Sequence, residues 1–140
     1  MQSKELNNLI IARLFPQEDV YDRLKEICRQ HKVKTAVVLS GIGQLAEFEL
    51  GFFKEKGNYL PEKFTKPAEL LTLNGLASLR DGGYEFHLHS SLSMSDKSVV
   101  GGHFINGKVS ITLEIVLLKT DLAIKRGTEK ATGLRGLFLN

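Results

Sequence analysis

Residues 83–90 read GYEFHLHS, and residues 99–104, a short turn later, read VVGGHF. Hydrophobic and polar side chains alternate in the first segment, as they do on a β-strand that has one face in a core. Phe86 and Leu88 then share the buried face, and His87 and His89 share the other. The two segments together predict a β-hairpin that carries three of the four histidines in the chain.

This hairpin also predicts a metal site. With Ser95-Asp96-Lys97 at the centre of the turn, antiparallel pairing places His103 opposite or diagonal to His89. Three neutral imidazoles are a known ligand set for zinc, and a fourth position left to water or substrate marks a reactive site. The Gly101-Gly102 pair allows close backbone approach or a bulge that redirects a side chain. We expect His87, His89 and His103 to bind zinc or another divalent transition metal; an exposed histidine pair without metal is the alternative.

The composition is that of one soluble globular domain. The chain has 140 residues, of which 42% are hydrophobic and 25% are charged. No apolar run approaches the ~20 residues that span a bilayer, and the first residues lack the basic and apolar regions of a secretory signal. The single cysteine, Cys28, cannot form an internal disulfide, and its apolar neighbours predict a buried thiol. We expect one cytoplasmic domain that covers residues 1–140, without membrane contact.

The formal net charge of +3 and an isoelectric point near 9.0 raise the question of nucleic-acid binding. The basic surplus lies after residue 107, but it forms no block of like charge and does not alternate with aromatic residues as in single-strand binders. We expect a solvated surface there, and weak contact with nucleic-acid phosphates stays open. The surplus consists of Lys108, Lys119, Lys125, Arg126, Lys130 and Arg135.

The N-terminal part predicts a strand and then a helix. Residues 8–15 are rich in strand-forming side chains, and Pro16 ends the strand. Apolar residues recur at helical spacing between residues 17 and 31, which predicts an amphipathic helix on the sheet. His31, in the last turn, is expected to complement the helix dipole. The predicted apolar face is made of Val20, Leu24, Ile27, Cys28 and His31.

Residues 35–40 predict another strand, and residues 41–46, GIGQLA, match the dinucleotide fingerprint G-x-G-x-x-A. That fingerprint needs a helix at the second glycine, whereas residues 47–53 have alternating β character. We therefore expect a glycine-hinged bend between two strands. The candidates for lining a ligand pocket are Ser40, Gly41, Gly43 and Gly102.

The C-terminal half predicts an antiparallel meander that follows an irregular surface loop at residues 54–67. Turns at residues 80–83, around Asp96 and at Asn106-Gly107 separate its strands. The strands cover residues 69–79, 84–92, 99–105 and 108–119.

The last predicted strand has one apolar face, made of Val109, Ile111, Leu113, Ile115 and Leu117. Glu114 lies on the other face and is a candidate acid/base or supporting group for the histidines; pairing with a surface lysine is the alternative.

The tail, residues 120–140, is expected to dock on the sheet or on a neighbouring subunit, which would bury its apolar side chains. Those side chains are Leu134, Leu137, Phe138 and Leu139.

Taken in order, these motifs resemble the PPC domain family (plants and prokaryotes conserved domain), in its prokaryotic stand-alone branch. The resemblance runs from Leu9 to about Leu137, and Arg126 and Thr132-Gly133-Leu134 match less distinctively. The motifs that carry it are GIG at 41–43, LGFF at 50–53, DG at 81–82, HLH at 87–89, GGH at 101–103 and EI at 114–115.

The resemblance implies an α+β domain with a curved, mainly antiparallel sheet of about six to seven strands and one main helix packed on it. It also implies a homotrimer, and it implies that His87, His89 and His103 match a metal site of the prokaryotic members, with zinc the expected ion. Plant members carry AT-hooks and act as nuclear DNA-binding regulators. This chain contains no Arg-Gly-Arg-Pro, so that mode of DNA binding is not carried over.

Three functions of different class stay open. We favour a metal-binding homo-oligomeric domain with a regulatory or interaction role. The first alternative is a zinc-dependent enzyme that acts on a small molecule at a subunit interface, because a metal with an open position polarises a substrate oxygen or activates a bound water. The second is a DNA-binding protein, for which a basic stripe and salt-dependent affinity are the marks.

Overall fold

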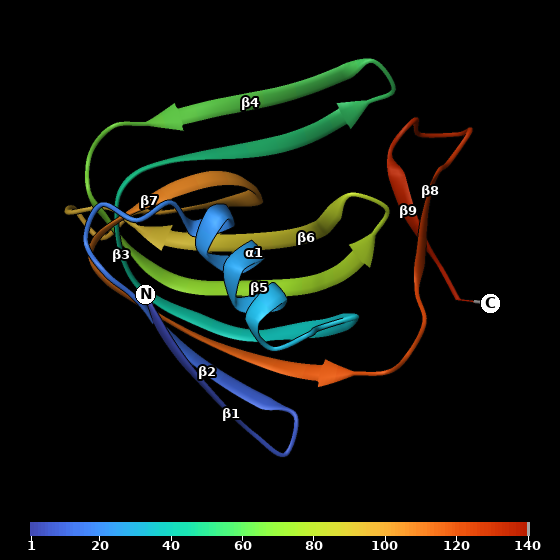
Figure 1. Ribbon diagram of the computed structural model, residues 1–140. Coiled ribbons are helices and arrows are strands. Elements are labelled where there is room, and N and C mark those ends of the chain that lie inside the picture. Colours follow the sequence, from blue (N-terminus) through green and yellow to red (C-terminus); the bar gives the residue numbers. More distant parts are fainter. Residues whose placement is uncertain (140) are drawn as a thin grey trace.

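The computed structural model describes residues 1–139, which contain nine strands and one helix. Seven strands form a sheet in the order β1-β2-β7-β6-β5-β3-β4, and β8 and β9 form a separate two-stranded sheet. The large sheet curves around helix α1, and the β8–β9 hairpin stands at one side of it (Figure 1). The elements are β1 (Gln2–Leu6), β2 (Leu9–Leu14), α1 (Val20–Gln30), β3 (Thr35–Glu55), β4 (Asn58–Phe64), β5 (Ala68–Arg80), β6 (Gly83–Ser93), β7 (Val99–Thr120), β8 (Lys125–Thr128) and β9 (Arg135–Phe138).

Strands β3 and β7 organise the sheet. They pair with each other from Thr35 opposite Thr120 to Gly51 opposite His103. In addition, β3 pairs with β5, β5 with β6 and β6 with β7, so the four strands close a circuit of hydrogen-bonded neighbours. Register shifts along β3 and β7 bend both strands, which allows the circuit to close. The predicted fold class is confirmed in its coarse form, a mainly antiparallel sheet with one helix.

Helix α1 forms where its apolar spacing predicts it. Asp19 caps the N-terminus, and its side chain accepts a hydrogen bond of 2.9 Å from the backbone N–H of Asp22. His31 is the C-cap residue, and its ring is hydrogen-bonded to Ser3 and lies 3.2 Å from the Glu5 carboxylate. The apolar side of the helix completes the core of the sheet, with Val20, Leu24, Ile27 and Cys28 buried. Within residues 1–139, no helix has the length and apolar character needed to cross a membrane.

Four strands lie outside the predicted set, β1, β4, β8 and β9, and none of their residues is buried. Strand β1 pairs with β2 across a turn at Asn7 and Asn8, which have φ values of 48° and 68°. Strand β4 occupies part of the expected loop at residues 54–67, so the prediction of an irregular structure there is wrong. Pro61 is tolerated because β4 is an edge strand, where one side of the backbone needs no partner. Exposed strands bury no face, so their sequence carries little periodicity.

The predicted turn at Asn106-Gly107 is also wrong, because β7 continues through it. Both residues pair with β3, opposite Glu49 and Phe48. Gly107 serves packing instead of a turn: a Cβ there would lie 2.9 Å from side-chain atoms of Leu45 and Phe104. The pairing partner therefore overrides the local turn signal.

The glycine-hinged bend is confirmed in a modified form, because residues 35–55 make one strand with register shifts. No helix opens at Gly43, so the dinucleotide fingerprint has no structural counterpart, as expected. A register shift between Gly43 and Leu45 leaves β7 with extra residues, and Ile111 turns outward with 61% of its surface exposed. The prediction that Ile111 joins the buried face is thus wrong.

Cys28 is fully buried, as predicted, and burial raises the pKa of its thiol to about 12. The thiol is therefore protonated and shielded at neutral pH. We expect a thiol reagent to modify Cys28 only after unfolding. Cys28→Ser should lower the free energy of unfolding by about 1–3 kcal/mol, because it buries a hydroxyl in an apolar site. Denaturant titration measures this effect, and rapid labelling of the folded protein would contradict the assignment.

Candidate metal centre

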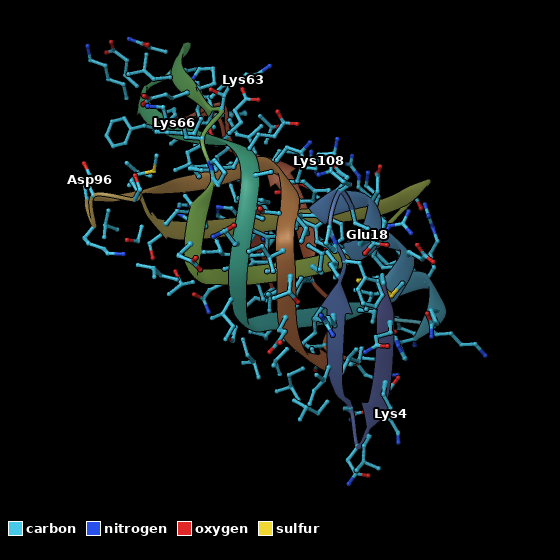
Figure 2. The ribbon with its side chains drawn as sticks, turned by 90° about the vertical axis from the view of Figure 1, so that its left-hand side faces the viewer. Lys4, Glu18, Lys63, Lys66, Asp96 and Lys108 are labelled. Carbon is cyan, nitrogen blue, oxygen red and sulfur yellow. The ribbon has the colours of Figure 1, made fainter. Side chains whose placement is uncertain are left out.

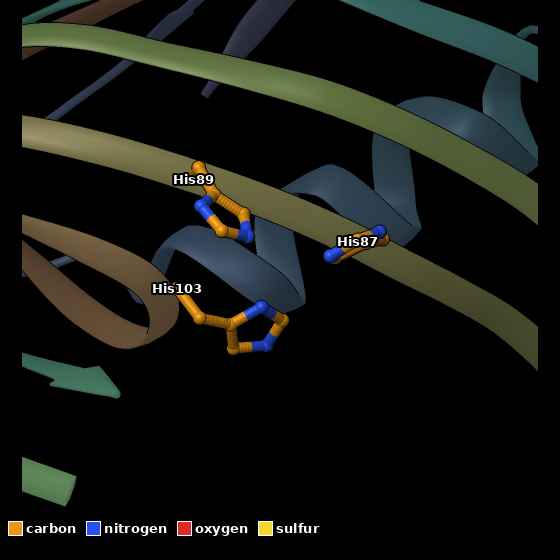
Figure 3. Close-up of side chains that lie close together, drawn as sticks. All are labelled: His87, His89 and His103. Atoms are coloured by element: carbon orange, nitrogen blue, oxygen red, sulfur yellow. The ribbon is translucent and has the colours of Figure 1, made fainter. Parts of the chain in front are cut away.

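Three histidines meet where β6 and β7 pair (Figure 3). His89 lies directly opposite His103, and His87 lies two residues away on the same face of β6. The ring centroids of His87 and His89 are 5.2 Å apart, and those of the other two pairs are 5.4 Å apart. One ring nitrogen from each residue lies within 4.8 Å of the other two. The predicted convergence of the three side chains is confirmed.

The donor set fits a divalent transition metal. An ion at the centre of a triangle with 4.8 Å sides lies about 2.8 Å from each corner, and a zinc–imidazole bond is ~2.0–2.1 Å long. Side-chain rotations that move each nitrogen by less than about 1 Å would therefore close the ligand set. Within residues 1–139, no carboxylate or thiol joins this cluster. Three imidazoles leave further coordination positions for water or a ligand.

Helix α1 holds the two strands in place at this site. The ring of Tyr21 packs against Phe86 and Phe104, with centroid distances of 5.5 and 5.7 Å. Its hydroxyl donates a hydrogen bond of 2.7 Å to the backbone carbonyl of Phe104. Phe86 and Phe104 are the chain neighbours of His87 and His103, so packing on the helix fixes the backbone from which both imidazoles project.

The histidines line an open cavity of about 930 Å³. Tyr59 of β4 lies edge-on to His103, with 6.4 Å between ring centroids. From the C-terminal hairpin, Arg126 of β8 and Arg135 of β9 also line the cavity. The volume of the cavity is in the range of small-molecule sites. Its polar side chains come from the β6–β7 pair, from β4 and from the β8–β9 hairpin.

Burial lowers the pKa of His87, and the positive charge of Arg126 and the neighbouring His89 lower it further. Burial also lowers the pKa of His103, with contributions from His87, His89 and Arg126. Both imidazoles are thus held in the neutral form near pH 7, which is the form that binds a metal.

Glu85 fastens the C-terminal hairpin to the sheet. Its carboxylate accepts hydrogen bonds from Arg135, 2.6 Å from Nε and 3.2 Å from Nη2, and lies 3.3 Å from Nη1 of Arg80. Desolvation raises the pKa of Glu85, but the hydrogen bonding and charge of Arg135, with Arg80 and Arg126 adding, hold it below its ordinary value. Both carboxylate oxygens are therefore engaged by arginines.

Of the other candidates, only Gly102 reaches the cavity with the histidines. Ser40 and Gly41 pair with residues 116 and 115 in the other half of β3 and β7, and Gly43 pairs with Leu113. Glu114 lies opposite Arg13 and Ile42, exposed and outside the histidine cluster. The GIG segment and Glu114 therefore belong to the paired region of β3 and β7 and do not line the cavity.

Four cavity residues were not candidate site residues in the sequence interpretation: Glu85 lies in a predicted strand, and the other three lie in elements that were not predicted. Tyr59 belongs to the expected loop, Arg126 and Arg135 belong to the basic tail, and Glu85 is a strand residue beside His87. The one available signal was the repeated Arg-Gly at residues 126–127 and 135–136, since Gly127 lies opposite Gly136 in the hairpin. That repeat alone does not place the hairpin beside the histidines.

The fold and the cluster together define a small, mainly antiparallel domain with a three-histidine site on its sheet. The chain belongs to the Plants and Prokaryotes Conserved (PCC) domain family, whose model matches residues 1–121. The hairpin that carries Arg126 and Arg135 lies beyond the matched residues.

The chain is also similar to three other proteins of known sequence or structure. The Bifunctional protein GlmU of Synechococcus sp. (strain JA-2-3B'a(2-13)) is 32% identical over 129 residues, which are 91% of this chain and 19% of that protein, so the chain spans about a fifth of its length. A metal-containing protein from Archaeoglobus fulgidus is 25% identical, with a TM-score of 0.84 over 96% of this chain and 95% of that chain. A protein from Bacteroides thetaiotaomicron, described as DNA binding, is 24% identical, with a TM-score of 0.91 over 99% and 96% of the two chains. At 24% identity, the similarity to the Bacteroides protein shows a shared fold alone.

Proposed function

We propose that this protein binds a divalent transition metal, with zinc the expected ion, through His87, His89 and His103. The observation that carries the proposal is the placement of three ring nitrogens within 4.8 Å of one another on paired strands. The description of the Archaeoglobus relative as metal-containing supports it. When bound, the ion would supply a Lewis acid with an open coordination position.

Elemental analysis of untagged protein purified without chelator tests this proposal. About one zinc ion per chain is the expected result, because the cluster offers one three-coordinate ligand set. Protein that contains no metal, and takes up none when zinc is added, would contradict it.

We favour a regulatory or interaction role for the metal-binding protein. We also favour a location in the cytoplasm, where the unpaired Cys28 is stable in its reduced form. A zinc-dependent enzyme for a small molecule is the second candidate. The cavity favours it, because catalysis needs room for a substrate beside the open position of the metal. Turnover of a substrate by the metal-loaded protein, and not by the metal-free protein, would decide for the enzyme.

DNA binding is the weaker candidate. In Figure 2 the labelled lysines Lys4, Lys63, Lys66 and Lys108 are spread along the molecule, and Glu18 lies between Lys108 and Lys4. This spacing argues against the continuous basic stripe that follows a phosphate backbone. The Bacteroides protein is similar to this chain in fold alone, and this similarity identifies no DNA-binding residues.

We also propose that the chain assembles as a homotrimer, through the face of the sheet that α1 leaves uncovered. Leu9 lies opposite Leu118 on this face, and Ile11 and Ile42 extend it across β2 and β3. The exposed fractions of these four side chains are 37%, 40%, 57% and 50% in that order. Exposed apolar side chains gathered on one face of a sheet are typical of subunit interfaces. The exposed apolar end of the tail, including Leu137 and Phe138, is proposed to dock on a neighbouring subunit.

Light scattering after size exclusion tests the assembly. The expected mass is about 47 kDa, three times the 15.6 kDa of one chain. Ile11→Glu should shift the protein toward the monomer mass, because a carboxylate would be buried without a partner at the interface. Leu60→Glu, at a similarly exposed position on β4 at the other edge of the sheet, is the matched control and should leave the mass unchanged. A monomeric parent would contradict the proposal.

A further inference from the structure

Arg126 has an unusual environment for a cation. Its Nε and Nη2 atoms are buried, and neither has a hydrogen-bond partner among residues 1–139. A desolvated guanidinium without a partner is unfavourable, because its lost hydration is not replaced. An arrangement of this kind is expected where a ligand supplies the missing acceptor.

The carboxylate that could serve Arg126 is already engaged. Glu85 attracts Arg126 electrostatically, but its two oxygens accept hydrogen bonds from Arg135 and Arg80. Arg135 also donates a hydrogen bond of 2.6 Å to the backbone carbonyl of Arg126, which fixes this part of β8. The guanidinium is therefore held in place by its backbone while its own donors stay free.

Arg126 and the three histidines share one cavity of about 930 Å³. A small molecule bound in the cavity can thus reach the histidine cluster and Arg126 together. The cavity volume suits a metabolite-sized ligand and not a polymer.

We propose that the cavity binds a small molecule with a carboxylate or phosphate group, which accepts hydrogen bonds from Arg126 while another oxygen of the same molecule faces the histidine cluster. The planar guanidinium presents parallel N–H donors that match the two oxygens of a carboxylate or phosphate. Only the contact between the ligand and the histidine cluster rests on the proposed metal function. The contact with Arg126 stands on its own geometry.

Calorimetric titration of the protein with and without added zinc, at fixed ionic strength, tests the proposal with three probes. Lactate supplies a carboxylate beside a hydroxyl, inorganic phosphate supplies the other oxyanion, and lactamide is the neutral analogue of lactate. We expect lactate or phosphate to bind and lactamide to bind at least about tenfold more weakly, since a charge-assisted pair is lost. The tighter of the two oxyanions identifies the group that the cavity prefers.

Three variants separate the contact from general electrostatics. Arg126→Gln should weaken oxyanion binding at least about tenfold, and Arg126→Lys should fall between this variant and the parent because it keeps the charge without the planar fork. Lys125→Gln removes the same charge from an exposed neighbouring position and should bind like the parent. Equal affinities for Arg126→Gln and Lys125→Gln would overturn the proposal.

Thermal unfolding without oxyanion provides a second readout. Removal of an unpartnered buried cation should leave the unfolding midpoint of Arg126→Gln unchanged or raised, whereas a clear fall would show a structural partner and overturn the proposal. Adding the oxyanion should raise the unfolding midpoint of the parent and not that of the variant.

Elemental analysis distinguishes this proposal from the proposed metal function. If the parent holds no metal but still binds oxyanion through Arg126, the metal function fails and the Arg126 contact stands.

Discussion

His89→Ala is expected to remove most of the bound metal while the protein stays folded. His89 faces away from the core and lies opposite His103 on the paired strand. Truncation to alanine therefore removes one of three ligands and creates no void in the hydrophobic core. Loss of an outer-shell partner alone lowers metal affinity about 10–100-fold, and loss of a direct ligand should exceed that. Zinc per chain, measured by elemental analysis after dialysis, reports the effect.

His31→Ala is the matched control for this substitution. His31 is the fourth histidine of the chain and lies at the end of helix α1, hydrogen-bonded to Ser3 and outside the cluster. Its variant should keep the metal content of the parent, although it loses contacts with β1. Unchanged zinc in His89→Ala, or equal loss in both variants, would remove His89 from the ligand set.

The triple variant of His87, His89 and His103 to alanine extends this test. It should hold no metal even at high added zinc, because no other cluster of metal-binding side chains is present in residues 1–139. Its circular dichroism spectrum should match that of the parent, since the neighbouring Leu88 and Phe104 form the core at this point. Zinc bound by the triple variant would place the metal elsewhere.

Gly43→Ala is expected to be among the most destabilising single substitutions in the chain. Gly43 has a φ of 152°, and a Cβ at this position would lie 2.0 Å from the carbonyl oxygen of Thr112 on β7. No side-chain rotation relieves a contact with backbone, so β3 and β7 would have to separate where Gly43 pairs with Leu113. We expect the free energy of unfolding to fall by more than about 3 kcal/mol, as for other severe overpacking and backbone strain.

Gly57→Ala separates backbone strain from the steric contact. Gly57 also has a positive φ, 81°, but nothing lies within 4 Å of the position of its Cβ. This variant should lose only about 1–2 kcal/mol, the cost of placing an L-residue in the left-handed region. Denaturant titration of the two variants gives both values. Equal destabilisation would show that the paired backbones of β3 and β7 at Gly43 relax more easily than their close packing indicates.

The comparison of Gly43 with Gly57 also corrects the sequence interpretation of the GIG motif. From the sequence, Gly41 and Gly43 are candidates for a ligand pocket. In the structure both are close-contact positions: a Cβ at Gly41 would lie 2.7 Å from the Cβ of Leu73, and Gly43 abuts Thr112. The motif therefore permits close pairing of β3 with its neighbours, and the candidate glycine that lines the histidine cavity is Gly102 in the other half of β7.

Local pattern in the sequence determined the helix and the histidine hairpin. The period of apolar residues in α1 and the strict alternation from Phe86 to His89 each depend on one buried face, so they are readable without knowledge of the neighbours. The register that places His103 opposite His89 follows from one short turn. Those features were enough to predict the convergence of three imidazoles.

Only the tertiary structure decided the rest of the cavity. Pairing with β3 carries β7 through Asn106-Gly107, because a long partner strand outweighs a local turn signal. Strand β4 and the β8–β9 hairpin bury little of their own surface, so their sequences carry no period that reveals them. Arg126 thus lies 23 residues after His103 in the chain, yet it faces the same cavity because Arg135 and Glu85 fasten its hairpin to β6. Contacts between elements that are distant in sequence are fixed by packing, which the sequence pattern of one element does not encode.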